Sequence, residues 1–355
     1  MSKSNEAPES TSSSSSLEMQ DSDMGSWQQR IAAITEVTGL YLIFGTLALL
    51  VLLFSGVDFG AVIPSGPNPD YLGASFTLLI ILLIQYAFLL IPAFLIGWWH
   101  RRRPVKSYGV TRNSRPVIRL VLFGVVGFAL GDLVFKLVKW AQLYLPFLGP
   151  IPPTQPWILT ADWTHWGFWL YMAIGSFVLV PILEELFFRG YLQTRLAEDF
   201  GGPTAVLISS SIFTFGHAQF LFLSFFGISS VIAAFIGSLI FGYLYYRTKS
   251  LIPSILMHML ANIPLREPGI TILLIVMIAI ILVSYKLLNR YLREFWRDIR
   301  SIPFKWVAIG FSVYGAIFMA LFGYYVTAIF IVGFVSLPLA LILEFIEKRR
   351  LKAAR

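Results

Sequence analysis

The chain has 355 residues, of which 57% are hydrophobic and 13% are charged, and its mean hydropathy is +0.75. Because a soluble globular chain is about one-quarter charged, this composition excludes an ordinary soluble domain. The absence of cysteine excludes disulfides, a thiolate nucleophile and thiolate metal sites. The net charge of +8 does not indicate nucleic-acid binding, because the basic residues sit in short loops beside apolar runs.

The chain begins with a Ser-, Glu- and Asp-rich segment, residues 1–28, which cannot bury enough apolar surface to order itself. We expect it to be a disordered cytoplasmic tail. Ten apolar runs long enough to cross a bilayer as helices follow it. They are 36–55, 73–99, 117–141, 165–188, 203–223, 226–246, 251–265, 269–288, 304–322 and 325–345. The predicted fold is an all-α, polytopic transmembrane bundle of about ten spans, with a conical site between helices.

Loop charge predicts the orientation of these spans. The loop 100–119 and the C-terminal segment are rich in Lys and Arg, whereas the loops 56–72 and 143–164 are weakly charged. Since basic loops stay on the cytoplasmic side, we expect both termini to be cytoplasmic, in a protein of the plasma membrane. The segment Lys286–Arg300 mixes basic and aromatic residues, which predicts a cytoplasmic surface helix on anionic lipid.

Three polar motifs interrupt the apolar spans. They are Glu184–Glu185 with Arg189, Phe213 with His217, and His258 with Asn262. Ionisable groups inside a membrane cost several kcal/mol and face protein or a wet cavity. Glu185 and Arg189 are spaced to pair on one helix face, and His258 and Asn262 also share a face. Arg189 is therefore expected to be an internal partner of one acid while the other acid faces a cavity.

These groups permit peptide hydrolysis by an activated water. Glu184 can act as the general base, and His217 can orient the water and pass a proton to the leaving amine. His258 and Asn262 can donate hydrogen bonds to the oxyanion. Alternatively, Glu184, His217 and His258 can bind zinc with one open position. We favour a reaction without a cofactor, because the His–Glu–x–x–His pattern of site-2-type metalloproteases is absent.

The ordered set of motifs resembles the CPBP (CAAX-processing and bacteriocin-processing, or ABI) intramembrane endopeptidases, which include the type II CAAX prenyl protease. The resemblance covers about residues 165–265, which it marks as a catalytic core. The predicted N-terminal transmembrane helices occupy residues 29–164. Residues 266–355 contain the predicted C-terminal transmembrane helices and a basic cytoplasmic tail. The resemblance implies a glutamate-dependent endopeptidase with Glu184 and His217 as the water-activating pair. It further implies that His258 and Asn262 form the oxyanion site. Glu185 and Arg189 would be supporting residues, and Phe213 would form a wall of the site.

The expected partners are the lipid bilayer and a peptide or membrane-anchored protein substrate. Two other functions stay open on the sequence. One is a catalytically idle scaffold or immunity-type protein of the same fold. The other is a proton-coupled transporter that uses the intramembrane Glu and His as a relay. The intact motif set speaks against the first, and the lack of visible matched halves speaks against the second.

Overall fold

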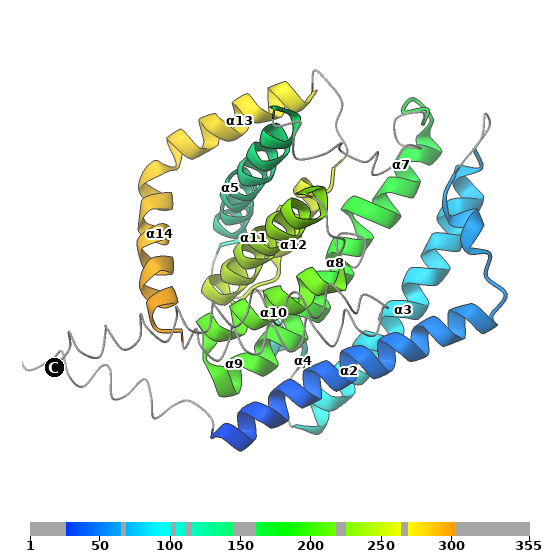
Figure 1. Ribbon diagram of the computed structural model, residues 1–355, viewed down its shortest axis with the longest axis horizontal. Helices are drawn as coiled ribbons and strands as arrows, with labels where there is room; N and C mark the ends of the chain where they lie inside the picture. Colours follow the sequence, from blue (N-terminus) through cyan, green and yellow to red (C-terminus); the bar gives the residue numbers. More distant parts are fainter. Residues whose placement is uncertain are drawn as a thin grey trace, which may run out of the picture.

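The computed structural model describes residues 26–64, 69–100, 104–110, 116–144, 161–217, 225–263 and 269–302. Over these ranges the chain consists of helices joined by turns, without a β-strand (Figure 1). The predicted all-α class is therefore confirmed for the described residues.

The N-terminal part contains three long helices, with short ones between them. Its elements are α2 (Trp27–Phe54), the 3-10 helix η1 (Phe59–Val62), α3 (Tyr71–Trp99), α4 (Pro104–Ser107) and α5 (Val117–Tyr144). α2 begins nine residues before the predicted span because Ser26 caps it: the Ser26 hydroxyl accepts from the Gln29 N–H, and the Gln29 side chain accepts from the Ser26 N–H. The end of the predicted tail, residues 27–28, is thus helical, and residues 1–25 lie outside the described residues.

The next stretch is a single interrupted helix. It comprises α7 (Trp166–Met172), the π-helical segment η3 (Ala173–Phe177), α8 (Leu179–Glu185), the π-helical segment η4 (Leu186–Gln193) and α9 (Thr194–Phe200). It forms a 35-residue candidate span, Trp166–Phe200, so the predicted end at residue 188 is wrong. The helix continues because Arg195 is neutralised: its guanidinium lies 2.8 Å from Glu36 and 2.5 Å from Asp199.

The remaining described elements are α10 (Gly202–Gly216), α11 (Phe225–Thr248), α12 (Ile252–Ala261), α13 (Gly269–Val283) and α14 (Tyr285–Arg300). Gly201 lies in the left-handed region (φ 76°) and turns the chain from α9 into α10. α10 has 15 residues and α12 has 10, about 22 Å and 15 Å of helix. Both are too short to cross a hydrocarbon core of about 30 Å alone.

The described residues do not reach the predicted ten spans. Four helices are long and apolar enough to cross a membrane, or five if the bent pair α13–α14 is one span. They are Gln28–Phe54, Tyr71–Trp99, Trp166–Phe200 and Ser230–Thr248. The predicted spans 203–223 and 251–265 are too long, since the helices end at Gly216 and Ala261. The predicted span 269–288 is too long because the chain bends by 77° after Val283. The predicted spans 304–322 and 325–345 lie outside the described residues. These apolar helices identify an integral membrane protein.

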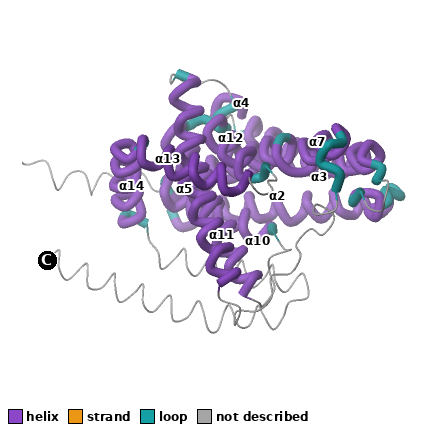
Figure 2. Tube along the Cα trace, turned by 90° about the horizontal axis from the view of Figure 1, so that it is seen from above, coloured by secondary structure: helices purple, strands orange, loops and turns teal. Residues whose placement is uncertain are grey.

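The motif-bearing helices lie in the middle of the molecule. In Figure 1, α3 stands on one side and α13 and α14 on the other, with α8, α11 and α12 between them, and Figure 2 shows α11 and α12 in the same intermediate position. α12 packs closely on α5 because Gly124, Gly127 and Gly131 lack side chains there. A Cβ at Gly124 would lie 2.9 Å from the backbone oxygen of Pro253 and 3.2 Å from Leu256. Small residues allow such close helix packing in membrane proteins.

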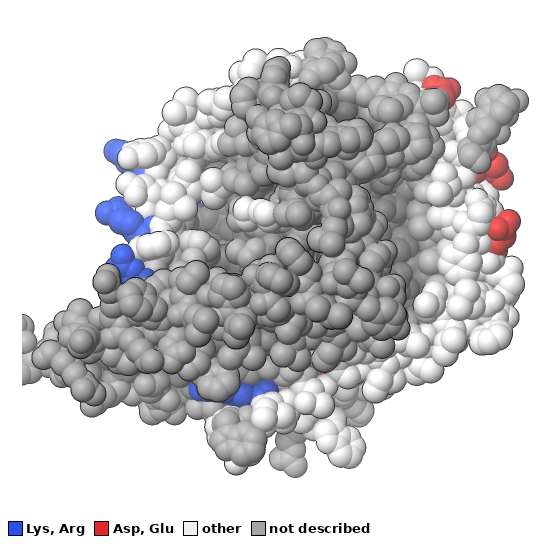
Figure 3. All heavy atoms as spheres, viewed as in Figure 1, with Lys and Arg blue, Asp and Glu red and all other residues white. Residues whose placement is uncertain are grey.

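Charge is distributed unequally over the surface. In Figure 3, Lys and Arg side chains lie along the edge that α14 forms in Figure 1, and Asp and Glu side chains lie at the opposite edge. The exposed acids at the ends of α2, α3 and α7 are Asp58, Asp70 and Asp162. Hydrogen bonds from Thr164 lower the pKa of Asp162, which favours the ionised form of this exposed acid. α14 buries none of its residues fully and exposes Lys286, Arg290 and Arg293.

Candidate active site

Two π-helical segments flank the paired glutamates. η3 ends at Phe177, before α8, and η4 starts at Leu186, directly after Glu185. π-helical turns are rare and occur frequently at functional sites, because they change the direction of the side chains that follow. Glu185 is fully buried, and the Glu184 side chain is 14% exposed. Both carboxylates therefore lie inside the protein and need internal partners.

Arg189 is the internal partner of Glu185. The Arg189 side chain is fully buried, and its Nε lies 3.3 Å from Glu185 Oε2. Its Nη2 donates to the hydroxyl of Ser238 in α11 at 2.8 Å and to the Ser238 carbonyl oxygen at 3.1 Å. The guanidinium also lies 4.7 Å from the centroid of the Phe213 ring, a cation–π distance. The pairing expected from the i,i+4 spacing is thus present, and it places Arg189 away from the surface.

His258 in α12 lies between the two glutamates. Its Nδ1 is 3.0 Å from Glu185 Oε1, and its Nε2 is 3.6 Å from Glu184 Oε2. The imidazole is stacked on the Phe241 ring, with centroids 4.7 Å apart and planes at 19°. Because a carboxylate can only accept a hydrogen bond, Nδ1 carries a hydrogen and donates a hydrogen bond to Glu185. The two acids therefore share one histidine although they are adjacent on a helix.

Glu184 has a different environment from Glu185. Its Oε1 accepts a hydrogen bond of 3.3 Å from the Tyr86 hydroxyl of α3. Its Oε2 is buried and has no hydrogen-bond partner among the described residues. A buried carboxylate oxygen without a donor is costly, so Oε2 is an unsatisfied acceptor of this cluster.

Phe213 and His217 bring α10 to this cluster. The Phe213 ring lies 4.5 Å from the His217 ring and 5.9 Å from the His258 ring, measured between centroids. His217 Nδ1 is 2.9 Å from the Phe213 carbonyl oxygen. A carbonyl only accepts, so Nδ1 bears the proton and Nε2 is the basic nitrogen of the neutral ring. A Cβ at the neighbouring Gly216 would lie 2.7 Å from the Tyr41 hydroxyl of α2, which explains why glycine precedes this histidine.

Asn262 lies at the C-terminal end of α12 and has other partners than His258. Its Nδ2 donates to the Ser176 carbonyl oxygen at 3.1 Å, and the Ser176 hydroxyl donates to the Asn262 carbonyl oxygen at 3.1 Å. This reciprocal pair fastens the end of α12 to η3. One of the two amide hydrogens of Asn262 is used in this way, which leaves the second as a donor.

The structure thus brings Glu184, Glu185, Arg189, Phe213 and His258 into direct contact, with His217 joined through Phe213 and Asn262 joined through Ser176.

Sequence reasoning missed Tyr86, Tyr41, Ser176 and Ser238. Each is a single polar residue in an apolar run without a motif, so only the contacts reveal it. Among the described residues, no group of three or more His, Asp or Glu side chains is arranged to hold a metal ion.

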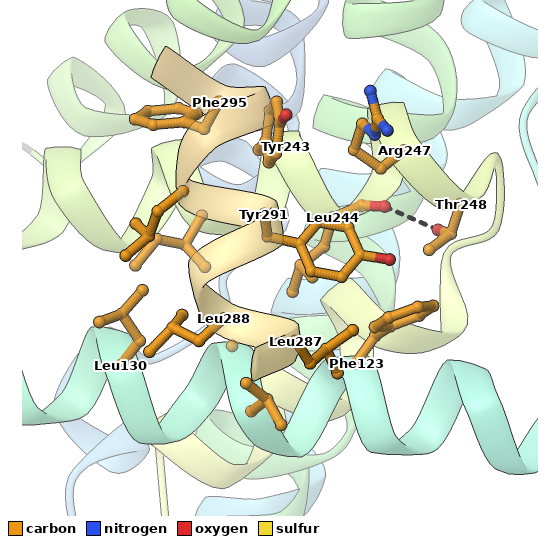
Figure 4. A pocket seen from close by; sticks show the side chains of 14 residues that line it. Phe123, Leu130, Tyr243, Leu244, Arg247, Thr248, Leu287, Leu288, Tyr291 and Phe295 are labelled. Carbon is orange, nitrogen blue, oxygen red and sulfur yellow. Dashed lines mark hydrogen bonds between the residues drawn. The ribbon is translucent and has the colours of Figure 1, made fainter. Parts of the chain in front are cut away.

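An apolar cavity lies elsewhere, between α5, α11 and α14 (Figure 4). Its wall includes Phe123, Leu130, Leu244, Leu288 and Tyr291. None of the motif residues lines it. Its surface is almost wholly apolar, and Arg247 in its wall is paired with Glu294 and lies 3.6 Å from Asp298. The paired glutamates and the two motif histidines lie outside this cavity.

Comparison with known proteins agrees with the motifs. Residues 166–264 match the family model of the type II CAAX prenyl endopeptidases, Rce1-like. This stretch runs from the first residue of α7 to just beyond α12 and contains all the motif residues. The predicted family resemblance is thereby confirmed, over less than a third of the chain. No curated protein and no solved structure gives a significant match.

Proposed function

We propose that this Rce1-like membrane protein is an intramembrane endopeptidase, which hydrolyses peptide bonds of membrane-associated proteins or peptides. The match over residues 166–264 supports a protease. The observation that carries the mechanism is the buried Oε2 of Glu184, an acceptor without a hydrogen-bond donor among the described residues, 3.6 Å from His258 Nε2. An acceptor of this kind next to an imidazole can hold and deprotonate a water.

The reaction starts with a water between Glu184 and His217. Glu184 Oε2 accepts one proton of the water while the water oxygen forms a bond with the carbonyl carbon of the substrate. The carbonyl π electrons move onto the oxygen and give a tetrahedral oxyanion. His217 Nε2 orients the water by accepting a hydrogen bond from its second hydrogen. The oxyanion then re-forms the carbonyl as the C–N bond breaks, and the proton taken up by Glu184 passes through His217 Nε2 to the leaving amine nitrogen.

His258 and Asn262 are proposed to hold the oxyanion. With His258 protonated, the charges of Glu184, Glu185, Arg189 and His258 sum to zero, which lowers the cost of burying them. The Nε2–H of His258 then becomes a donor beside Glu184 Oε2. The second amide hydrogen of Asn262 can supply another donor. Removing one oxyanion donor typically slows a hydrolase by about a hundredfold to a thousandfold.

We propose that the reaction needs no metal. Nδ1 of His258 is engaged by Glu185 at 3.0 Å, and Nε2 faces Glu184. Among the described residues, no three His, Asp or Glu side chains are placed together to hold a metal ion. A zinc ion held by Glu184, His217 and His258 would bind Nε2 of His258 and leave its Nδ1 contact with Glu185 in place. Chelator sensitivity of the activity distinguishes the two chemistries.

The active protein is proposed to lie in the plasma membrane with both termini in the cytoplasm. The exposed basic residues of α14 and the acids at the opposite edge support this orientation through the preference of Lys and Arg for the cytoplasmic side. The substrate would then be a peptide bond close to the cytoplasmic half of the bilayer, on a protein or peptide that the membrane retains.

The test uses the full chain, purified in detergent, with internally quenched peptides. Each peptide is made with and without a farnesylated cysteine, and cleavage is measured with and without the chelator EDTA. We expect cleavage that EDTA does not reduce, and a fall in rate of about a thousandfold for Glu184→Gln. The matched control is Asp132→Asn, a buried acid of α5 outside the motifs, which should retain the rate. Undiminished cleavage by Glu184→Gln would refute the role of this residue, and loss of activity in EDTA would refute the metal-free reaction.

A further inference from the structure

We infer that Tyr86 is a positioning residue for Glu184, supplied by a helix outside the segment that matches the protease family. This inference rests on the proposed function and deepens it. Tyr86 belongs to α3 (Tyr71–Trp99), and the matched segment begins at residue 166. Its hydroxyl donates to Glu184 Oε1 at 3.3 Å. A long-range contact of this kind makes the N-terminal helices part of the catalytic unit.

The contact decides which carboxylate oxygen reacts. With Oε1 occupied by Tyr86, the Glu184 carboxylate cannot rotate freely, and Oε2 is directed to the side of His258. Oε2 has no hydrogen-bond partner among the described residues, so it is the oxygen whose acceptor capacity is unused. Without the tyrosine hydroxyl, both oxygens would compete for the water and for His258. A general base must be held in its productive geometry by surrounding groups.

Tyr86 is itself held in place. It is 6% exposed and belongs to a hydrophobic cluster that includes Leu82, Leu89 and Phe187. In this cluster α3 packs against η4, the π-helical segment after Glu185. Since an aromatic side chain packed on all sides has few alternative rotamers, the position of its hydroxyl follows from the docking of α3 on η4.

Several groups besides Tyr86 lie near Glu184. They are Tyr41 from α2, His258 from α12, and Glu185 and Arg189 from the same interrupted helix. Tyr86 adds to these a hydrogen bond that its hydroxyl donates to the carboxylate. Loss of the Tyr86 hydroxyl should therefore leave Oε1 without this donor and let the carboxylate rotate.

The experiment compares the wild-type protein with Tyr86→Phe, which keeps the ring and removes the hydroxyl. The probe is the internally quenched peptide that the wild type cleaves fastest. We expect kcat to fall about tenfold, as for the loss of one hydrogen bond to a charged group. KM should stay unchanged, because the hydroxyl acts through its hydrogen bond to Glu184.

Tyr108→Phe is the matched control. Tyr108 is fully buried, and its hydroxyl donates to the Ala93 carbonyl oxygen of the same helix α3 at 3.1 Å. Its removal should lower stability about as much as Tyr86→Phe does, without a change in kcat. Equal kinetic effects in the two variants would reduce Tyr86 to a structural residue and overturn the inference.

A second readout needs no substrate. The infrared difference spectrum between the wild type and Glu184→Gln isolates the carboxylate band of Glu184, and Tyr86→Phe should shift this band. An unshifted band, or a shifted band with unchanged kinetics, would overturn the inference while the peptidase proposal stands. If Glu184→Gln cleaves the peptide as fast as the wild type, the roles proposed for Glu184 and Tyr86 both fail, and if the wild type cleaves no peptide, the proposed function fails. The infrared band then still reports whether the contact exists.

Discussion

Glu184 and Glu185 are neighbours in sequence but differ in environment. Glu185 is fully buried and lies within 3.3 Å of Arg189 and 3.0 Å of His258. Glu184 has Tyr86 on one oxygen and no described donor on the other. Two carboxylates with unequal surroundings commonly have different roles in catalysis. Glu185 therefore fits a structural role, and Glu184 fits the role of the base.

The structural role predicts a large loss of stability for Arg189→Met. The variant leaves Glu185 buried with an uncompensated charge, which should lower the free energy of unfolding by about 3–5 kcal/mol. The double variant Glu185→Leu with Arg189→Met should regain most of this loss, because no buried charge is left unpaired. Thermal unfolding in detergent measures both.

Arg297→Met is the control for this prediction. The Arg297 side chain is 73% exposed and lies 3.7 Å from Asp298, a surface pair worth less than about 1 kcal/mol. A variant Arg189→Met as stable as Arg297→Met would show that the buried pair does not stabilise the fold.

Much of the site follows from sequence at the residue scale. The i,i+4 spacing predicts the contact between Glu185 and Arg189, and a buried acid–histidine cluster is expected from ionisable residues in apolar spans. The contacts of Tyr86 and Ser238 could not be predicted. They depend on the packing of α3 and α11 against the interrupted helix. Tyr86 lies 98 positions from Glu184 in the chain, and Ser238 lies 49 positions from Arg189.

At the scale of elements, sequence hydropathy fails where helices contain charged residues or end before the apolar run does. The predicted span ends at Phe188, directly before Arg189, but Arg189 pairs with Glu185, and Arg195 further on pairs with Glu36, Glu198 and Asp199. It also joined α10 and α12 to the apolar residues that follow them, since an apolar run does not reveal where a helix stops. The π-helical segments η3 and η4 have no sequence signature of comparable strength.

Close packing between α5 and α12 predicts the effect of a small substitution. Gly124→Ala places a Cβ 2.9 Å from the Pro253 carbonyl oxygen, a backbone atom that cannot move alone. We expect α12 to shift, with a loss of about 1–3 kcal/mol in stability. Peptidase activity should fall as well, because α12 carries His258. Thermal unfolding and peptide cleavage of the same preparation measure the two effects.

Gly39→Ala in α2 is the matched control, since a Cβ there meets no atom within 4 Å. It should leave stability unchanged or slightly increased, because alanine is the better helix former. If Gly124→Ala behaves like Gly39→Ala, the glycines of α5 do not determine the position of α12.

At the scale of the whole molecule, the charge asymmetry predicts a topology that labelling can measure. The chain has no cysteine, so Asp58→Cys and Arg290→Cys each introduce a single reactive thiol. Asp58 is exposed between α2 and α3, and Arg290 is exposed on α14. A membrane-impermeant maleimide should label Asp58→Cys in intact cells, and Arg290→Cys only after permeabilisation. Labelling of both variants from the same side would contradict the proposed orientation.

The claim that the protein hydrolyses peptide bonds with a water activated by Glu184 is tested most directly by following the oxygen atom of that water. In a single turnover in water enriched with oxygen-18, mass spectrometry of the peptide products reports where the heavy oxygen goes. A water activated by Glu184 predicts one heavy oxygen in the new carboxyl group of the first product formed, and no product from Glu184→Gln. An unlabelled first product, with the heavy oxygen found in Glu184 instead, would show direct attack by the carboxylate and contradict the account.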